Sequence, residues 1–252
     1  MDLWQELILA VVGIAAGFLN VMAGGGSLLV MPVMVLMDVP GPVANGTTRL
    51  AILAQNISAT AGFRRKGYSN LRLSLTLAAC ALPGAVVGAM FGTQLDGVWF
   101  NRVLAGVMIA VLILMATGRK PSATSERPPT TRRRLIIGHL LMVGAGLYGG
   151  FIQAGVGFIL MAILHRVMGI DLVRVNMHKV IIVGIYTVAA IVIFAADGSV
   201  LWTTGLVLAA GMALGGWIGS HVAVGRGERL IRVVFNLALV ALAVNLILQS
   251  MR

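Results

Sequence analysis

Apolar residues in this chain are gathered into eight long blocks, and short stretches between them hold most of the charged residues. A helix needs about 20 apolar residues to cross a bilayer. The blocks cover residues 3–37, 42–63, 71–93, 99–117, 134–168, 173–195, 201–223 and 230–250. The first and fifth are too long for one straight helix and too short for two, whereas the others have the length of one crossing. This pattern predicts an all-α polytopic membrane protein.

Glycines interrupt the two overlong blocks near their middles. The first block contains Gly24-Gly25-Gly26, and the fifth contains Gly149-Gly150 followed by Gly155-Val156-Gly157. Glycine is less favourable than alanine inside a helix by about 1 kcal/mol. Each of these blocks is therefore predicted to fold as a glycine-broken helical hairpin.

The chain also repeats itself, because residues 13–110 and 144–241 share one pattern at a constant offset of 131. The matched landmarks are Ala23 with Ala154, Asn45 with Asn176, Phe63 with Phe194, Gly67 with Gly198, and Gly84 with Gly215. Duplicated apolar chains are the usual construction of secondary transporters. We expect a first repeat at 1–117, a linker at 118–133 rich in Pro, Ser, Thr and charge, and a second repeat at 134–252. Each repeat would hold a broken hairpin and three transmembrane helices.

The distribution of Lys and Arg favours inverted repeats. Basic residues near helix ends prefer the cytoplasm. Eight simple crossings with an internal N-terminus leave eleven basic residues inside and six outside. If both hairpins return to their own side, the count becomes fifteen inside and two outside. Both termini are then expected in the periplasm and the 118–133 linker in the cytoplasm. The alternative is a plain bundle of eight helices.

Composition agrees with a membrane protein. The chain is 59% hydrophobic and 11% charged, with a mean hydropathy of +0.97, whereas soluble domains carry roughly 25% charged residues. The net charge of +11 comes from basic residues that flank apolar blocks, so it does not indicate a nucleic-acid partner. The single cysteine, Cys80, excludes a disulfide framework.

The residues from Gly17 to Pro32, with Ala-Gly-Gly-Gly-Ser-Leu-Leu-Val-Met-Pro at 23–32, resemble the TauE/SafE sulfite exporter family. Ala44–Thr48 and Gly67 belong to the same resemblance, and Gly155–Phe158 repeats it in register. The resemblance spans nearly the whole chain. It implies a transporter of the bacterial inner membrane for sulfite, short organosulfonates or a related small anion. The second copy departs from the first, for example where His178-Lys179 stands for Thr47-Thr48, and this leaves the anion open.

The glycine breaks are the first candidate for the substrate site. A helix that starts near the middle of the membrane offers unpaired N–H groups and a positive end, and both attract anions. The alternative is that the glycines only let helices pack closely. The candidate residues are Gly24, Gly25, Gly26, Ser27, Gly155, Val156 and Gly157.

Arg49 and Lys179 are the second candidate, because each lies about two turns inside an apolar block. Embedded charges are costly and usually functional. Residues from opposite repeats could together neutralise a divalent anion, and the alternative is that both snorkel to the interface. Further candidates for hydrogen bonds to the substrate are Asn45, Asn176, Thr48 (the counterpart of Lys179), Gln55 and Tyr186. His178 is the candidate for proton coupling, since histidine ordinarily titrates near pH 6.5.

These observations lead to one functional hypothesis. The chain is expected to be a secondary transporter that exports a small sulfur oxyanion, sulfite or a short organosulfonate, by alternating access. An anion channel, or a carrier for another small organic anion such as a carboxylate, is the alternative. No catalytic constellation, Walker motif or metal-ligand cluster is evident, so we expect neither an enzyme nor a cofactor. The expected partners are the anion and the lipid bilayer, and the sequence leaves the oligomeric state and the coupling ion open.

Overall fold

The computed structural model describes residues 3–95, 97–100, 102–106 and 131–224, and every regular element in these ranges is helical. The all-α prediction is therefore confirmed. The elements are α1 (Leu3–Met22), α2 (Ser27–Leu36), α3 (Gly41–Arg65), α4 (Leu71–Thr93), α6 (Arg132–Phe151), α7 (Val156–Met161), the π-helix η1 (Ala162–Val167), α8 (Leu172–Ala196) and the unlabelled helix Trp202–Val224. Most of the 99–117 block, the 118–133 linker except its end, and the 230–250 block lie outside the described residues.

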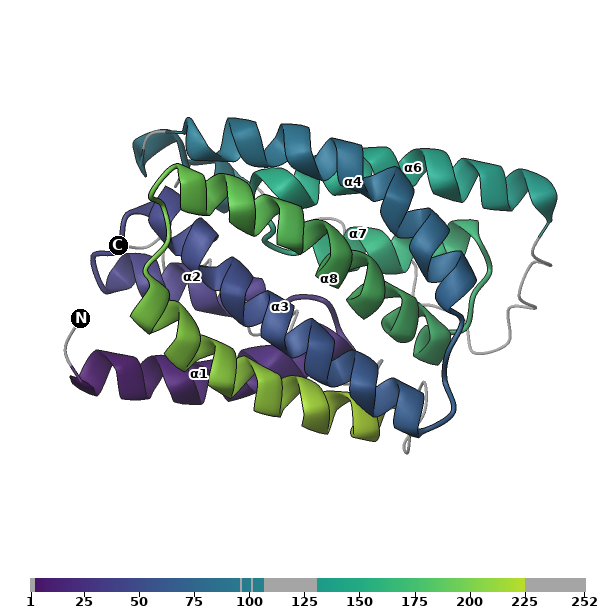
Figure 1. Ribbon diagram of the computed structural model, residues 1–252, viewed down its shortest axis with the longest axis horizontal. Helices are drawn as coiled ribbons and strands as arrows, with labels where there is room; N and C mark the ends of the chain where they lie inside the picture. Colours follow the sequence, from purple (N-terminus) through teal and green to yellow (C-terminus); the bar gives the residue numbers. More distant parts are fainter. Residues whose placement is uncertain (1–2, 96, 101, 107–130, 225–252) are drawn as a thin grey trace.

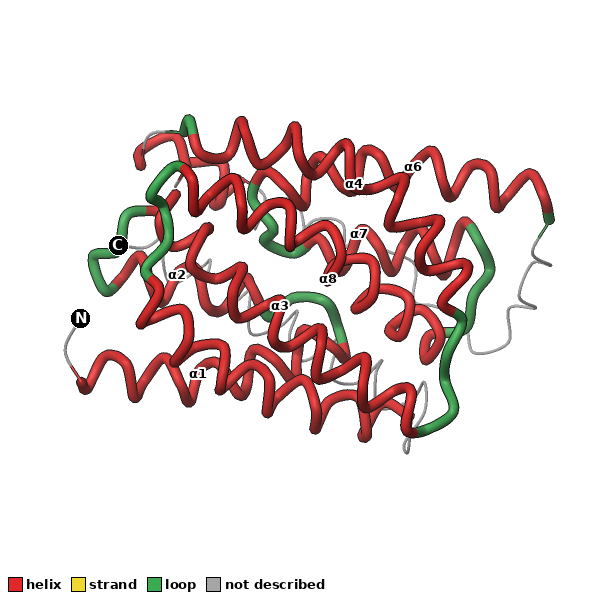
Figure 2. The backbone as a smooth tube through the Cα atoms, in the orientation of Figure 1, coloured by secondary structure: helices red, strands yellow, loops and turns green. Residues whose placement is uncertain are grey.

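Helices lie side by side along the length of the molecule, and most loops gather at its two ends (Figure 2). Two loop segments instead lie in the interior, one between α1 and α2 and the other between α6 and α7. They are the two predicted breaks. α1 and α6 start from opposite ends of the bundle (Figure 1). Arg134 at the start of α6 donates a hydrogen bond to the Val167 carbonyl at the end of η1 (3.3 Å), so the second hairpin returns to the end where it began.

The second break lies at residues 152–155, between and partly within the two glycine groups that interrupt the fifth block. Gly149 and Gly150 remain in the last turn of α6, and the helix ends at Phe151. A side chain on Gly150 would meet the backbone of Ala85, with Cα only 2.6 Å from an added Cβ. These two glycines thus permit close packing and do not mark the break. α6 begins at Arg132, within the last residues of the predicted linker.

Two helix pairs hold the repeats together through small residues. α6 packs on α4, where Gly84 lies against Val143 and Leu147. α1 packs in the same way on the Trp202–Val224 helix, where Gly215 lies against Ile14 and Phe18. Small residues spaced by four positions let helix backbones approach closely in a membrane. In both pairs the first helix of one repeat contacts a helix of the other repeat.

These contacts also reveal a register shift within the repeat. Gly17 lies against Met212, and Gly146 lies in the same way against Ala81. Positions 81 and 212 fit the offset of 131, whereas 17 and 146 are 129 apart. The first helices of the repeats therefore correspond at an offset of 129. Both breaks have the same length, 23–26 and 152–155, so the two additional residues lie after the second break, where α7 and η1 have six residues each and α2 has ten.

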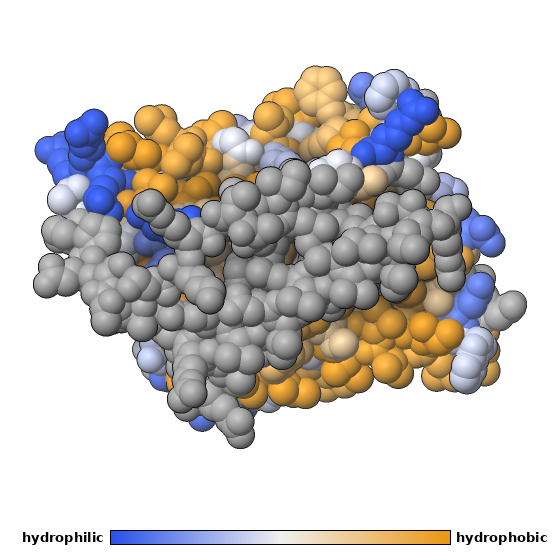
Figure 3. Space-filling model, turned by 180° about the vertical axis from the view of Figure 1, so that it is seen from behind, coloured by the Kyte–Doolittle hydropathy of each residue, from blue (hydrophilic) through white to orange (hydrophobic). Residues whose placement is uncertain are grey.

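Five of the described helices are long and apolar enough to span a membrane: α1, α4, α6, α8 and Trp202–Val224. Where Figure 3 shows described residues, apolar side chains lie between the two ends of the molecule, and hydrophilic ones gather at the ends. α3 has 25 residues but is more polar, and most of its polar side chains are buried. This helix turns its polar face into the bundle, whereas Ile57 on its outer face is 63% exposed. The chain is a multi-pass membrane protein.

Candidate functional site

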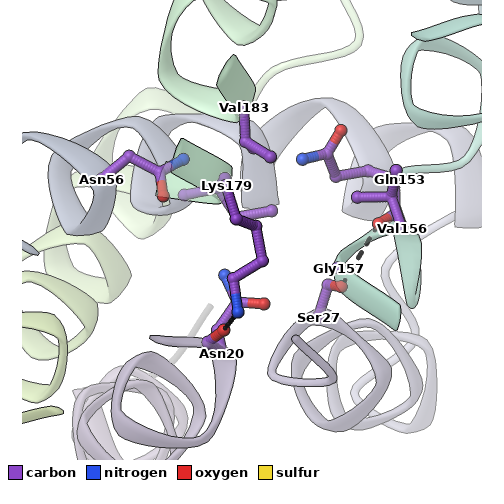
Figure 4. A pocket seen from close by; sticks show the side chains of 9 residues that line it. Asn20, Ser27, Asn56, Gln153, Val156, Gly157, Lys179 and Val183 are labelled. Atoms are coloured by element: carbon purple, nitrogen blue, oxygen red, sulfur yellow. Dashed lines mark hydrogen bonds between the residues drawn. The ribbon is translucent and has the colours of Figure 1, made fainter. Parts of the chain in front are cut away.

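A small polar cavity lies where the two interior breaks meet (Figure 4). Its volume is about 10 Å³, which is roughly the room that one water molecule needs. Two branched apolar side chains line it from matched positions 131 apart, Ile52 of α3 and Val183 of α8. Its polar lining is Asn20, Ser27, Asn56, Gln153 and Lys179.

The predicted glycines bring the two breaks together. Gly24 has a left-handed backbone (φ +87°) and lies directly against Gly157. A Cβ on Gly24 would fall 2.6 Å from the carbonyl carbon of Gly157, so neither position has room for a side chain. Gly25 faces the Phe158 ring, and Gly26 packs against α1. Close packing of the hairpins thus explains these glycines, and Gly157 also reaches the cavity wall.

Ser27 ties one break to the other at the cavity wall. Its hydroxyl accepts a hydrogen bond from the N–H of Gly155 (3.3 Å) and donates one to the carbonyl of Gln153 (3.4 Å). Val156 lines the same wall. The sequence candidates from both breaks are therefore neighbours in space.

Arg49 caps the broken end of α6. Its guanidinium donates to the carbonyls of Gly149 (3.2 Å) and Gly150 (2.5 Å) and lies 4.4 Å from the Phe194 ring centre. Asn45, one turn earlier on α3, donates to the Phe151 carbonyl (2.8 Å) and accepts from Arg49 (3.2 Å). The last carbonyls of a helix lack partners within it and carry partial negative charge. A buried cation at this place donates hydrogen bonds to these carbonyls and balances their negative charge.

Lys179 does the same for the broken end of α1. Its ammonium donates to the carbonyls of Asn20 (2.9 Å) and Val21 (3.0 Å) and to the Asn176 side chain (2.8 Å). Asn176 in turn donates to the Met22 carbonyl (3.4 Å). The three capped carbonyls of each helix correspond at the offset of 129. Each repeat thus supplies an Asn and a cation that cap the broken helix of the other repeat.

This arrangement separates the two predicted charges. Arg49 is 0% exposed and Lys179 is 3% exposed, so neither side chain snorkels to the interface. Arg49 contacts the end of α6, whereas Lys179 contacts the end of α1. Among the described residues, Lys179 is the one charged side chain that lines the cavity.

The remaining sequence candidates lie around the cavity or away from it. The Thr48 hydroxyl donates to Ala44 of its own helix (2.6 Å), and His178 pairs with Ser74 of α4 (2.8 Å). Tyr186 is fully buried beside Gly149. Gln55 does not line the cavity but accepts a hydrogen bond from Asn20 of its wall (2.5 Å).

Asn56 was not predicted from the sequence, and Gln153 was only a weak candidate because it flanks the glycine break. Gln153 has a left-handed backbone (φ +57°), which is uncommon outside glycine and often marks functional sites. Asn56 follows Gln55 directly, and its polarity in an apolar block was the available signal. No group of three His, Cys, Asp or Glu side chains that could hold a metal ion occurs in the described part of the chain.

Comparison with known proteins places this geometry in a family context. Residues 9–246 match the model of the sulfite exporter TauE/SafE family. The probable membrane transporter protein ORF9 of a Sinorhizobium species is 28% identical over 239 residues, covering 95% of this chain and 91% of that protein. A probable membrane transporter protein of Haemophilus influenzae is 28% identical over 235 residues (92% and 91%), and YfcA of Escherichia coli, also a probable membrane transporter protein, is 24% identical over 245 residues (96% and 90%). No solved structure matches the chain.

Proposed function

The chain belongs to the sulfite exporter TauE/SafE family, and on this premise we propose that it exports a small sulfur oxyanion across the bacterial inner membrane by alternating access. Sulfite or a short organosulfonate is the proposed substrate. The observation that carries the proposal is the cavity between the breaks, with the Lys179 ammonium in its wall. A buried cation in a membrane is costly unless it is paired, and it attracts an anion strongly.

The donors at this cavity suit an oxyanion. Lys179 supplies a positive charge, Ser27 a hydroxyl, and Asn56 and Gln153 side-chain amides. Hydrogen bonds that involve a charged partner are shorter and stronger than those between neutral groups. An anion with several oxygens can accept from more than one of these donors. Its oxygens would replace helix carbonyls as partners of Lys179.

The size of the cavity supports a moving hairpin. A sulfite ion is larger than a water molecule, so a cavity of about 10 Å³ has no room for it. Binding therefore requires the two breaks to separate. In transporters built from inverted repeats, one repeat rocks against the other around a site at their interface. We propose that the hairpins, which start from opposite ends of the bundle (Figure 1), open the cavity alternately to each side.

The membrane potential agrees with export. An inside-negative potential favours the exit of an anion by about 2.3 kcal/mol per charge per 100 mV. Export therefore needs no coupling ion, whereas import of the same anion would need one. His178 hydrogen-bonds to Ser74 of α4, and it is not among the residues that line the cavity, so we propose no proton-coupling role for it.

Transport by reconstituted protein tests this function. Proteoliposomes loaded with unlabelled sulfite should accumulate labelled sulfite by counterflow, and uptake should saturate. Ethanesulfonate and acetate in the external medium test for competition by a sulfonate and a carboxylate. Inhibition by acetate alone would favour the carboxylate carrier, and a steady current that does not saturate would favour the channel. Absence of sulfite counterflow would refute the proposal.

A further inference from the structure

The side-chain amide of Asn56 has a donor without a partner. Asn56 lies on α3 and is 2% exposed. Its oxygen accepts a hydrogen bond from Gln55 (3.3 Å), whereas its nitrogen has no hydrogen-bond partner among the described residues. Buried polar groups in folded proteins nearly always have partners, so an exception calls for a functional explanation or a bound molecule.

A chain of amides fixes which way this donor points. The Asn20 nitrogen donates to the Gln55 oxygen (2.5 Å), and the Gln55 nitrogen then donates to the Asn56 oxygen (3.3 Å). The Asn56 oxygen is thereby held on the side of Gln55. Its nitrogen must face the other way, towards the cavity that Asn56 lines.

Other donors converge on the same space from different elements. In Figure 4 the nitrogens of Asn56 and Gln153 face each other across the cavity, and the Lys179 side chain lies between their walls. Asn56 belongs to the first repeat, whereas Gln153 and Lys179 belong to the second. A ligand at this place would be surrounded by N–H groups, so it needs lone pairs on more than one side.

We propose that Asn56 is a substrate-binding residue whose amide N–H donates a hydrogen bond to an oxygen of the transported oxyanion. The proposal rests on the function proposed above and names one ligand within its site. The donor is neutral, so it binds an oxygen without adding to the charge that Lys179 supplies. The Gln55 contact orients the amide before the anion arrives.

The second repeat offers a matched control. Thr187 stands at the position equivalent to Asn56, 131 residues later on α8. Its hydroxyl is also fully buried without a hydrogen-bond partner in the described ranges, but Thr187 does not line the cavity. A change at Thr187 therefore reports the effect of altering a buried unpaired group away from the ligand.

The test measures sulfite binding to purified full-length protein by calorimetry. Asn56→Leu keeps a similar shape and removes the donor, and Asn56→Asp keeps the acceptor for Gln55 while removing the donor. We expect each to weaken sulfite binding about tenfold or more, as for a lost hydrogen bond to a charged group. Thr187→Val should bind sulfite within about twofold of wild type, and thermal unfolding of each variant without ligand reports whether it is folded.

The outcomes separate this inference from the proposed function. Wild-type affinity in a folded Asn56→Leu or Asn56→Asp protein would refute the role of Asn56 and leave the transporter proposal standing. Equal weakening by Thr187→Val would also refute it, since the effect would then come from general packing. If wild-type protein binds neither sulfite nor ethanesulfonate, the inference and the proposed function fail together.

Discussion

Arg49 and Lys179 show how a membrane protein can use buried charges to satisfy the carbonyls of broken helices. Both satisfy carbonyls at a broken helix end, with an Asn one turn away or less on the same helix. Besides its contact with Phe194, Arg49 donates to four carbonyl or amide oxygens, those of Gly149, Gly150, Asn45 and Gln153. Lys179 combines its cap with a place in the cavity wall. The two residues should therefore respond differently to substitution.

Lys179→Gln should weaken sulfite binding about tenfold or more, because a charge-assisted hydrogen bond is worth roughly 1.5–3 kcal/mol. Arg49→Gln should mainly lower the free energy of unfolding, by roughly 1–3 kcal/mol, since it leaves buried carbonyls of α6 unpaired. Arg49→Lys should retain only part of the free energy of unfolding that Arg49→Gln loses, because lysine lacks the planar fork of arginine. Binding isotherms and thermal unfolding of the same samples measure both effects. A stable Arg49→Gln protein that no longer binds sulfite would contradict this division of roles.

At the scale of elements, the same residue type serves two purposes in the broken helices. Gly24 takes a positive φ and contacts Gly157 at the meeting of the breaks, whereas Gly150 stays helical and packs on α4. A sequence reports only that glycines are clustered. It does not say whether a glycine meets another backbone or turns the chain, because that depends on a partner helix distant in sequence. Both breaks were predictable from their glycines, but the pattern did not show that Gly149 and Gly150 stay helical.

Gly157→Ala should disturb the contact between the breaks, because its Cβ would overlap Gly24 and force the hairpins apart. We expect a loss of roughly 1–3 kcal/mol in stability, as for overpacking in a core, together with loss of sulfite counterflow. Gly144→Ala is the matched control in α6, where an added Cβ meets nothing within 4 Å. It should leave transport intact and, by helix propensity, stabilise the protein by up to about 1 kcal/mol. Thermal unfolding and counterflow of both variants decide the matter, and full transport by Gly157→Ala would argue against a tight hairpin contact.

At the scale of the whole molecule, features that depend on local sequence patterns were predictable, whereas features that depend on contacts between distant residues were not. Apolar blocks and repeat landmarks are local, so the helices and both broken hairpins could be read from the sequence. The cavity depends on pairs such as Ser27 with Gln153 and Lys179 with Asn20, which come from opposite repeats. The offset of 129 between the capped carbonyls was hidden, because the landmarks after the breaks fit 131. Charges within the blocks identified Arg49 and Lys179, but nothing in the pattern identified the carbonyls that they cap.

Inverted repeats make a prediction about orientation that uses two equivalent loops. Lys66 and Asp197 are 131 residues apart, both are exposed, and each precedes a glycine with a φ near +80° (Gly67 and Gly198). The α3–α4 loop and the loop after α8 lie at opposite ends of the bundle (Figure 1). The basic loop of Arg64, Arg65 and Lys66 is expected in the cytoplasm, as Lys and Arg prefer that side. On a Cys80→Ser background, a membrane-impermeant maleimide added to intact cells should therefore label Asp197→Cys and leave Lys66→Cys unlabelled until the cells are opened. Labelling of both positions from the same side would instead support the plain bundle of eight helices, in which these loops share one side of the membrane, and the alternating opening of the cavity by inverted hairpins would have to be abandoned.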